Sequence, residues 1–95
     1  MKQIKYQNET IDIQLSQYAE PNNNAILGFS ENGMLYGVFS TNVDFPIPHD
    51  EVIIDSNNGP QYVQLLIDAD VIESEPIYHI GSGFCDFPVY KLKEK

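Results

Sequence analysis

The side chains best suited to covalent chemistry stand near the end of the chain, where His79, Cys85 and Asp86 lie within eight residues. A cysteine thiolate beside a histidine base, oriented by a carboxylate, is an established arrangement for nucleophilic catalysis. Cys85 follows Phe84 where a loop is expected to meet a strand, and a lone cysteine with aromatic neighbours is more typical of a small buried apolar side chain. The pattern therefore favours a structural role for Cys85, with a catalytic role as the alternative.

Two other segments gather potential metal ligands. His49, Asp50 and Glu51 are consecutive, whereas a metal site normally draws its ligands from separated positions. The segment 68–75, DADVIESE, offers four carboxylates to calcium, but it lacks the mid-loop glycine and the paired helices of an EF-hand. We therefore expect solvated side chains in both segments and predict no metal ion.

The more specific short motifs of enzymes are absent from the 95 residues. The sequence has no phosphate-cradling glycine loop, no His-Glu-x-x-His or Cys-x-x-Cys pair and no Gly-x-Ser-x-Gly turn. We predict a protein without catalytic activity and without a cofactor.

Charge is distributed unevenly along the chain. There are fourteen acidic residues and five lysines, giving a formal net charge of −9, and the lysines all stand at the two ends. Residues 6–90 contain thirteen of the acids and no lysine or arginine. Because cations are needed to neutralise phosphates, this composition argues against direct binding of nucleic acid or of an anionic membrane. With a single cysteine, no signal peptide and no long apolar stretch, we expect a cytoplasmic protein.

Alternating apolar and polar residues predict strands in the first half of the chain. Residues 4–6 and 11–15 are expected to pair as a hairpin that turns at Asn8 and Glu9. The runs AILGFSE and MLYGVFSTN flank Asn32-Gly33, a pair typical of a type I′ turn, and predict a second hairpin. Gly28 and Gly37 within these strands indicate bulges or close packing under an aromatic ring. The prolines of FPIPHD predict an extended loop.

One helix and a final strand are expected in the second half. VIID predicts a short strand, and Pro60 suits the first turn of a helix capped by Asn58 or Gly59. An apolar stripe on this helix is formed by Tyr62, Val63, Leu66, Ile67 and Val71. The segment IYHIGSGFCDFPVYKL indicates a glycine-rich loop and a last strand. We predict a single compact domain, residues 1–95, of the α+β class: an antiparallel β-sheet of about five or six strands, built from hairpins, with one α-helix packed on one face.

The C-terminal run SGFCDFPVYKL resembles the ending of a family of short proteins of unknown function carried on bacterial plasmids, conjugative elements and phages. The asparagine-rich turn and strand at 23–26 and the Asp-x-Asn-Asn sequence at 55–58 resemble the same family in the same order. Between them, its hairpin is resembled by Gly33, Tyr36, Thr41, Asn42 and Val43. The resemblance covers residues 22–92, about three-quarters of the chain. It implies carriage on mobile DNA and, since some relatives are associated with anti-CRISPR activity, an inhibitory role. It implies no catalytic residues.

The acidic middle of the chain predicts a protein partner. Uncompensated carboxylates repel one another, and a protein that keeps them commonly gains solubility or attraction to something basic. Two of them, Asp68 and Asp70, fall near the expected C-terminus of the helix, where the macrodipole disfavours anions by about 0.3–1 kcal/mol each. Duplex DNA would require about eighteen charges over ~30 Å, and one strand about nine. The chain therefore has enough acids to imitate one strand if they gather on one face.

We hypothesise that the protein binds and inhibits a host defence nuclease, such as a CRISPR effector, or another basic nucleic-acid-binding protein, with its carboxylates in place of phosphates. The candidate partner-binding residues are Asp44, Asp50, Glu51, Asp68, Asp70, Glu73 and Glu75. The alternative is a generic protein-interaction module with an apolar contact surface, for example through Tyr18, Phe45 or Tyr78, in which the acids serve only solubility.

Overall fold

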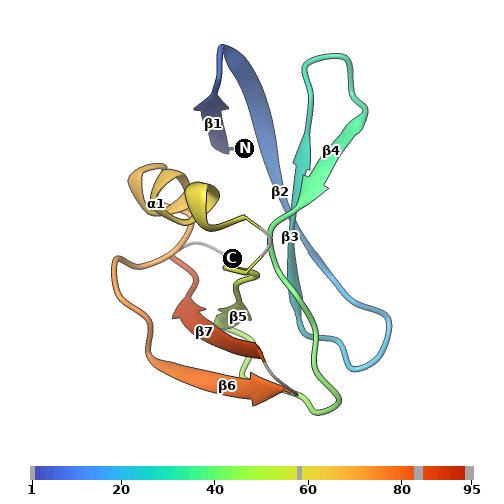
Figure 1. The fold of residues 1–95 in the computed structure, drawn as a ribbon. Coiled ribbons are helices and arrows are strands. Elements are labelled where there is room, and N and C mark those ends of the chain that lie inside the picture. Colours follow the sequence, from blue (N-terminus) through green and yellow to red (C-terminus); the bar gives the residue numbers. More distant parts are fainter. Residues whose placement is uncertain (1, 58, 83–84, 94–95) are drawn as a thin grey trace.

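The computed structural model describes residues 2–57, 59–82 and 85–93, which form seven strands and one helix (Figure 1). The elements follow in the order β1 (Lys2–Tyr6), β2 (Glu9–Gln17), β3 (Asn24–Phe29), β4 (Leu35–Val38), β5 (Glu51–Ile53), α1 (Pro60–Asp68), β6 (Tyr78–Ser82) and β7 (Cys85–Lys91). All strand pairs are antiparallel. The expected combination of antiparallel strands with one helix is confirmed.

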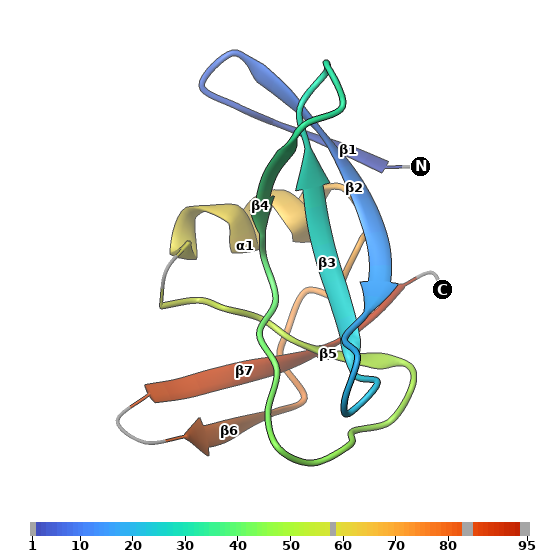
Figure 2. The ribbon, with the colours of Figure 1, turned by 90° about the vertical axis from the view of Figure 1, so that its right-hand side faces the viewer.

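The strands form two sheets, so the prediction of one sheet of five or six strands is wrong. The first sheet has the order β1-β2-β3-β4 and the second the order β5-β7-β6. In Figure 2, β3 runs up the page while β7 runs across it. The chain changes sheets just after β4, where the N–H of Asp55 donates to the carbonyl of Phe39 and the N–H of Thr41 donates to that of Ile53.

The first hairpin forms as predicted, with its turn one residue earlier. β1 and β2 pair from Lys2 opposite Ile13 to Tyr6 opposite Glu9. The two loop residues, Gln7 and Asn8, have φ angles of 51° and 68°. Positive φ at both central residues is the signature of a type I′ turn, whose twist matches that of the paired strands.

The second hairpin also forms, but with a longer loop than the expected two-residue turn. The N–H of Gly33 donates to the carbonyl of Ser30, and the N–H of Ser30 donates to the carbonyl of Met34. Only Gly33 in this loop has a positive φ, of 84°. The loop is therefore the three-residue kind, a type I turn followed by a left-handed glycine.

The main core lies between the inner face of the first sheet, α1 and the second sheet. Ile4 and Ile11 are opposite each other in β1 and β2, and both are buried with Ile26 of β3. Val52 of β5 and Leu66 of α1 belong to the same cluster and are completely buried. Burial of a side chain such as that of Leu66 stabilises the fold by about 1.5–3 kcal/mol.

Gly28 of β3 allows the ring of Phe39 to enter this core. A Cβ atom at Gly28 would lie 2.7 Å from Cε2 of Phe39 and 2.8 Å from Cγ2 of Ile11. The register between β3 and β4 also shifts between Gly28 and Phe29, which marks a bulge. Both predictions for this glycine are confirmed, whereas a Cβ atom at Gly37 would have no neighbour within 4 Å.

The helix starts where the sequence predicts it. Pro60 is its first residue and Gly59 its N-cap, while the other predicted cap, Asn58, lies outside the described residues. Leu66 is the buried residue of the helix. The helix ends at Asp68, so Val71 packs in the core from the segment that follows and is not part of the helical stripe.

The second sheet contains a strand that the sequence pattern did not predict. β6 pairs with β7 from Tyr78 opposite Val89 to Ser82 opposite Cys85, where a glycine-rich loop was expected. Its Ile80 is buried with Ile53 and Val89 in a small second core. The other residues of β6 whose exposure is described are exposed, which is typical of an edge strand and leaves little hydrophobic pattern to detect.

Candidate interaction surface

The seven carboxylates predicted to bind a partner come from four places in the fold. They are Asp44 in the loop before β5, Asp50 and Glu51 where β5 begins, Asp68 and Asp70 at and just after the end of α1, and Glu73 and Glu75 in the segment between α1 and β6. The structure brings two of the four places together around β7. Glu51 is opposite Lys91, and the N–H of Glu73 donates to the carbonyl of Lys91 from the other side.

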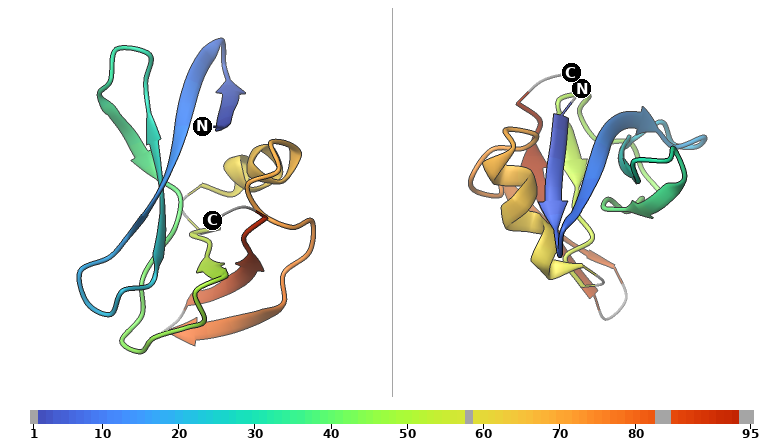
Figure 3. Two further views of the ribbon diagram at one scale, coloured as in Figure 1. Left: turned by 180° about the vertical axis from the view of Figure 1, so that it is seen from behind. Right: turned by 90° about the horizontal axis from the view of Figure 1, so that it is seen from above.

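Lysines from both ends of the chain fold back onto these acids. The ammonium group of Lys91 lies 3.3 Å from Asp50, and that of Lys93 lies 3.2 Å from Asp70. Figure 3 shows that β1 starts, and β7 ends, on the same side of the molecule, near the end of α1. The expectation that the acids lack cationic partners is therefore wrong for Asp50 and Asp70. Because these pairs are partly exposed, each contributes only about 0–1 kcal/mol.

The end of α1 also receives cations from elsewhere in the chain. Lys2 of β1 donates a hydrogen bond of 2.9 Å to the carbonyl of Asp70, whose side chain accepts from Lys93. Cations near the last carbonyls of a helix interact favourably with its macrodipole. The lysines that the local sequence lacks at this position are thus supplied by the tertiary structure.

Two further candidate acids have neutral partners. The hydroxyl of Tyr78 donates to Glu51 at 2.5 Å, and the side chain of Gln64 donates to Asp68 at 2.9 Å. The bond to Glu51 raises the pKa of Tyr78 to about 12, because ionisation would break it and place two negative charges together. Glu75 and Asp44 make no side-chain hydrogen bond or ion pair with the part of the chain that is described.

The residues considered for catalysis and metal binding are not arranged for either. In the β6–β7 ladder His79 is opposite Pro88 while Cys85 is opposite Ser82. Three ladder positions correspond to roughly 10 Å between these backbones. Across residues 2–57, 59–82 and 85–93, no three His, Cys, Asp or Glu residues are grouped as metal ligands.

The main group of exposed apolar side chains lies on the β3–β4 hairpin. Met34, Leu35 and Val38 are 66%, 59% and 42% exposed. Val38 is opposite Leu27 and Leu35 is opposite Phe29, so these side chains share the outer face of the sheet. We call this set the hairpin patch: Leu27, Phe29, Met34, Leu35 and Val38.

β3 is apolar on both of its faces. Ala25, Leu27 and Phe29 alternate along the strand with Ile26, which is fully buried, and with Gly28, under Phe39. A strand with one solvated face normally alternates apolar with polar residues, whereas a strand that is apolar on both faces is typically covered on both. On the outer face of β3, Ala25 is buried within this chain, whereas Leu27 and Phe29 are only partly covered and leave room for a partner.

Carboxylates border the hairpin patch. Asp12 of β2 is opposite Phe29, and Glu9 and Glu31 line one shallow depression between the two hairpin loops. β2, β3 and β4 contain no lysine, and the cations of the first sheet, Lys2 and Lys5, belong to β1. The patch and its border are thus apolar and negatively charged.

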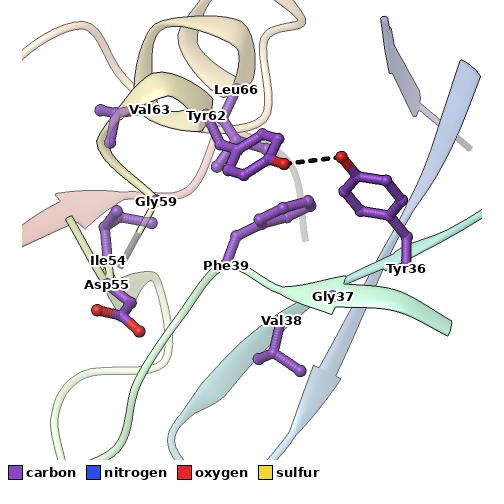
Figure 4. Close-up of a pocket in the computed structure, with 10 residues that line it drawn as sticks. All are labelled: Tyr36, Gly37, Val38, Phe39, Ile54, Asp55, Gly59, Tyr62, Val63 and Leu66. Carbon is purple, nitrogen blue, oxygen red and sulfur yellow. Dashed lines mark hydrogen bonds between the residues drawn. The ribbon is translucent and has the colours of Figure 1, made fainter. Parts of the chain in front are cut away.

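A small cavity lies beside β4, close to the hairpin patch (Figure 4). Its volume is about 120 Å³, and its lining residues are Tyr36, Gly37, Val38, Phe39, Ile54, Asp55, Gly59, Tyr62, Val63 and Leu66. The hydroxyls of Tyr36 and Tyr62 face each other at 2.7 Å, next to the ring of Phe39. This hydrogen bond raises the pKa of Tyr36 to about 12.

Of the three aromatic residues considered as apolar contacts, Phe45 is the most exposed, at 50%. Tyr78 donates to Glu51, and Tyr18 is partly buried with its hydroxyl 3.0 Å from that of Ser40. From the sequence, the residues of the hairpin patch were assigned only to strands, and no interaction surface was predicted there. The feature that could have indicated one is that β3 is apolar on both faces.

Among the described residues, the single helix α1 is too short to cross a membrane. Comparisons with protein families, with curated proteins and with solved structures found no match. The resemblance to proteins of mobile elements stays a prediction, and Gly83 and Phe84 of its SGFC sequence lie outside the described residues.

Proposed function

We propose that this protein is a non-enzymatic binding protein that recognises a basic partner protein through the hairpin patch and the carboxylates beside it. The observation that carries this proposal is the outer face of β3, which has the apolar pattern of a covered strand while Leu35 and Val38 beside it are exposed. Exposed apolar groups that lie together and are rimmed by polar residues are typical of protein interaction sites.

The charge of the surface selects the class of partner. Glu9, Asp12 and Glu31 border the patch, and no lysine of β2–β4 offsets them. Such a surface attracts a basic protein over a Debye length of about 8 Å at physiological salt and then holds it by apolar contact. A nucleic-acid-binding protein has the cationic groove that fits this description. The resemblance to mobile-element proteins supports a host nuclease, which the bound protein would inhibit by occupying that groove.

The test is affinity capture from host cells with matched variants. We expect the wild-type protein to retain a basic nucleic-acid-binding protein that added duplex DNA displaces. A Met34→Ser/Leu35→Ser variant should lose it, because both exposed side chains leave the patch. A Phe45→Ser variant, which changes another exposed large apolar residue outside the patch, should retain it.

Two outcomes contradict the proposal. One is a captured protein that stays bound to the Met34→Ser/Leu35→Ser variant while that variant unfolds at the wild-type temperature. The other is a captured protein without affinity for nucleic acid, or one that DNA does not displace.

A further inference from the structure

We infer that the partner adds an extended, basic segment to the open edge of β4 and places one branched aliphatic side chain in the cavity beside that edge. This inference rests on the proposed function, since it describes how the same partner is held. The site inferred here is the backbone edge of β4 with the cavity beside it. The hairpin patch is a different surface, on the outer face of the sheet.

The edge of β4 is open because β4 is the last strand of its sheet. The N–H of Phe39 donates to the carbonyl of Ile26 at 2.9 Å, towards β3. Successive residues of an antiparallel strand direct their N–H and carbonyl groups to opposite sides. Both backbone groups of Val38, which is opposite Leu27, therefore point away from β3, and among residues 2–57, 59–82 and 85–93 they have no backbone partner outside the sheet, so they can pair with an added strand.

A segment of the chain itself lies beside the end of β4, in the position where an added strand would continue. The N–H of Asp55 donates to the carbonyl of Phe39 at 3.0 Å, which extends the second sheet to the end of β4. After Asp55, Ser56 and Asn57 form a turn, and α1 begins at Pro60. The cavity lies where the two segments separate, with Gly37 and Val38 on one side and Tyr62 on the other (Figure 4).

The size and lining of the cavity select an aliphatic side chain. Its volume of about 120 Å³ is smaller than the roughly 150 Å³ of an apolar cavity that accepts benzene. Ile54, Val63 and Leu66 supply apolar walls. One hydrogen bond joins the hydroxyls of Tyr36 and Tyr62, so each already has a partner without the guest.

Charge complementarity selects a basic segment around that side chain. Asp55 lines the cavity, and Glu31 lies in the loop that begins β4. Residues 6–90 contain no lysine or arginine. The residues that flank β4 in the sequence therefore do not repel a cationic peptide. An alternation of lysine with leucine satisfies both the edge and the cavity, because alternate side chains of a strand face opposite sides.

The experiment uses the peptide acetyl-Lys-Leu-Lys-Leu-Lys-amide as the probe and the amide NMR spectrum of the full chain as the readout. We expect shift changes at Gly37, Val38 and Tyr62. A Gly37→Val variant should bind the peptide at least about tenfold more weakly, because the new side chain takes the space of the guest. It should still fold, since a Cβ atom at Gly37 has no neighbour within 4 Å.

Gly81→Val in β6 is the matched control, because a Cβ atom there also has no neighbour within 4 Å. This variant should bind the peptide as the wild-type does. A peptide with alanine in place of both leucines keeps the charge and loses the anchor, so it should bind the wild-type protein about tenfold more weakly. The alanine peptide tests the cavity even if Gly37→Val fails to fold.

Several outcomes overturn the inference. They are unchanged peptide binding by a folded Gly37→Val variant, equal binding of the alanine peptide, and shift changes confined to residues away from β4 and the cavity. Capture of the whole partner separates this inference from the proposed function. If Met34→Ser/Leu35→Ser loses the partner while Gly37→Val keeps it, recognition by the hairpin patch stands and strand addition does not. If neither variant loses it, both are wrong.

Discussion

Gly28 is the residue on which the packing of the first sheet depends most directly. Its backbone lies against the ring of Phe39, and the ring of Phe39 in turn packs on Tyr62 of α1 with centroids 4.8 Å apart. A single missing side chain thus allows strand and helix to share one aromatic cluster.

We expect Gly28→Ala to lower the free energy of unfolding by about 1–3 kcal/mol, because the added methyl group overpacks the core. The measurement is urea unfolding followed by circular dichroism. Gly37→Ala is the control and should change stability by no more than about 1 kcal/mol, since a Cβ atom there meets nothing within 4 Å. Equal effects at the two glycines would show that the close contact between Gly28 and the ring of Phe39 does not account for the loss of stability.

Tyr36 makes stability depend on alkaline pH. Its hydrogen bond with Tyr62 raises its pKa from the ordinary 10.0 to about 12. Between these values the unfolded chain loses the phenolic proton while the folded chain keeps it, so the unfolded state binds fewer protons. Stability from this group is fully present below the ordinary pKa and falls as pH rises through the folded one.

Urea unfolding at a series of alkaline pH values should therefore show a decline that Tyr36→Phe makes shallower. Tyr78, whose pKa is also raised to about 12, contributes a decline of the same sign, so the Tyr36→Phe/Tyr78→Phe variant should flatten the profile further. A profile for Tyr36→Phe with the wild-type slope contradicts the assignment.

At the scale of elements, the end of α1 lacks a basic residue of its own, and segments distant in the sequence supply cations near it. Its last turn contains no basic residue. Just beyond the helix end, Lys2 of β1 donates to the carbonyl of Asp70, and Lys93, after β7, pairs with the carboxylate of Asp70. The ends of the chain thereby stabilise a helix that its own sequence leaves without a cation.

We expect Lys93→Met to destabilise the protein by up to about 1 kcal/mol at low ionic strength, because the ion pair with Asp70 and the favourable charge at the helix end are both lost. The difference from wild-type should become negligible in 1 M salt, where exposed charges are screened. Thermal unfolding at both salt concentrations measures this. A difference that salt does not change indicates lost packing of the lysine stem instead.

For the whole molecule, the fold changes which charges are neighbours: the lysines stand at the two ends of the sequence, but three of them contact acidic residues in the structure. Lys2, Lys91 and Lys93 contact Asp70 and Asp50, so part of the predicted acidic set lies beside cations. Glu9, Asp12 and Glu31 stand near the hairpin patch, away from those contacts. The hairpin patch therefore has carboxylates beside its exposed apolar groups, and the described cation of that sheet closest to them is Lys5 of β1, opposite Thr10.

Neutralising Glu9, Asp12 and Glu31 to Gln, Asn and Gln should slow association with the basic partner by about tenfold at low salt and much less at high salt. Neutralising Asp68, Asp70, Glu73 and Glu75 to the matching amides removes more charge and is the control. It should slow association less, because those acids lie outside the border of the hairpin patch and Asp70 is paired with Lys93. Stopped-flow or surface-based kinetics at two salt concentrations distinguish the sets. A larger effect from the second set would indicate that the partner is attracted by the segment 68–75 and not by the acids beside the hairpin patch.

Much of the secondary structure could be predicted from short-range patterns. The alternation of Ile11 and Ile13 predicts a strand, and Pro60 after Gly59 predicts the start of a helix, because each pattern reflects a constraint within a few residues. β6 was not predictable in this way. Ile80 is its one buried side chain among those described, so its pairing depends on β7 more than on its own pattern.

The sequence by itself determined the two hairpins, the position of α1, the proline loop and the excess of acid over base, since these follow from backbone preferences and composition. Only the tertiary structure decided that the strands divide into two sheets, that Lys91 and Lys93 meet Asp50 and Asp70, and that Leu35 and Val38 are exposed. The physical reason is that these outcomes depend on which surfaces from distant segments pack together. A side chain of the same type is core, ion-paired or exposed according to what the fold places opposite it.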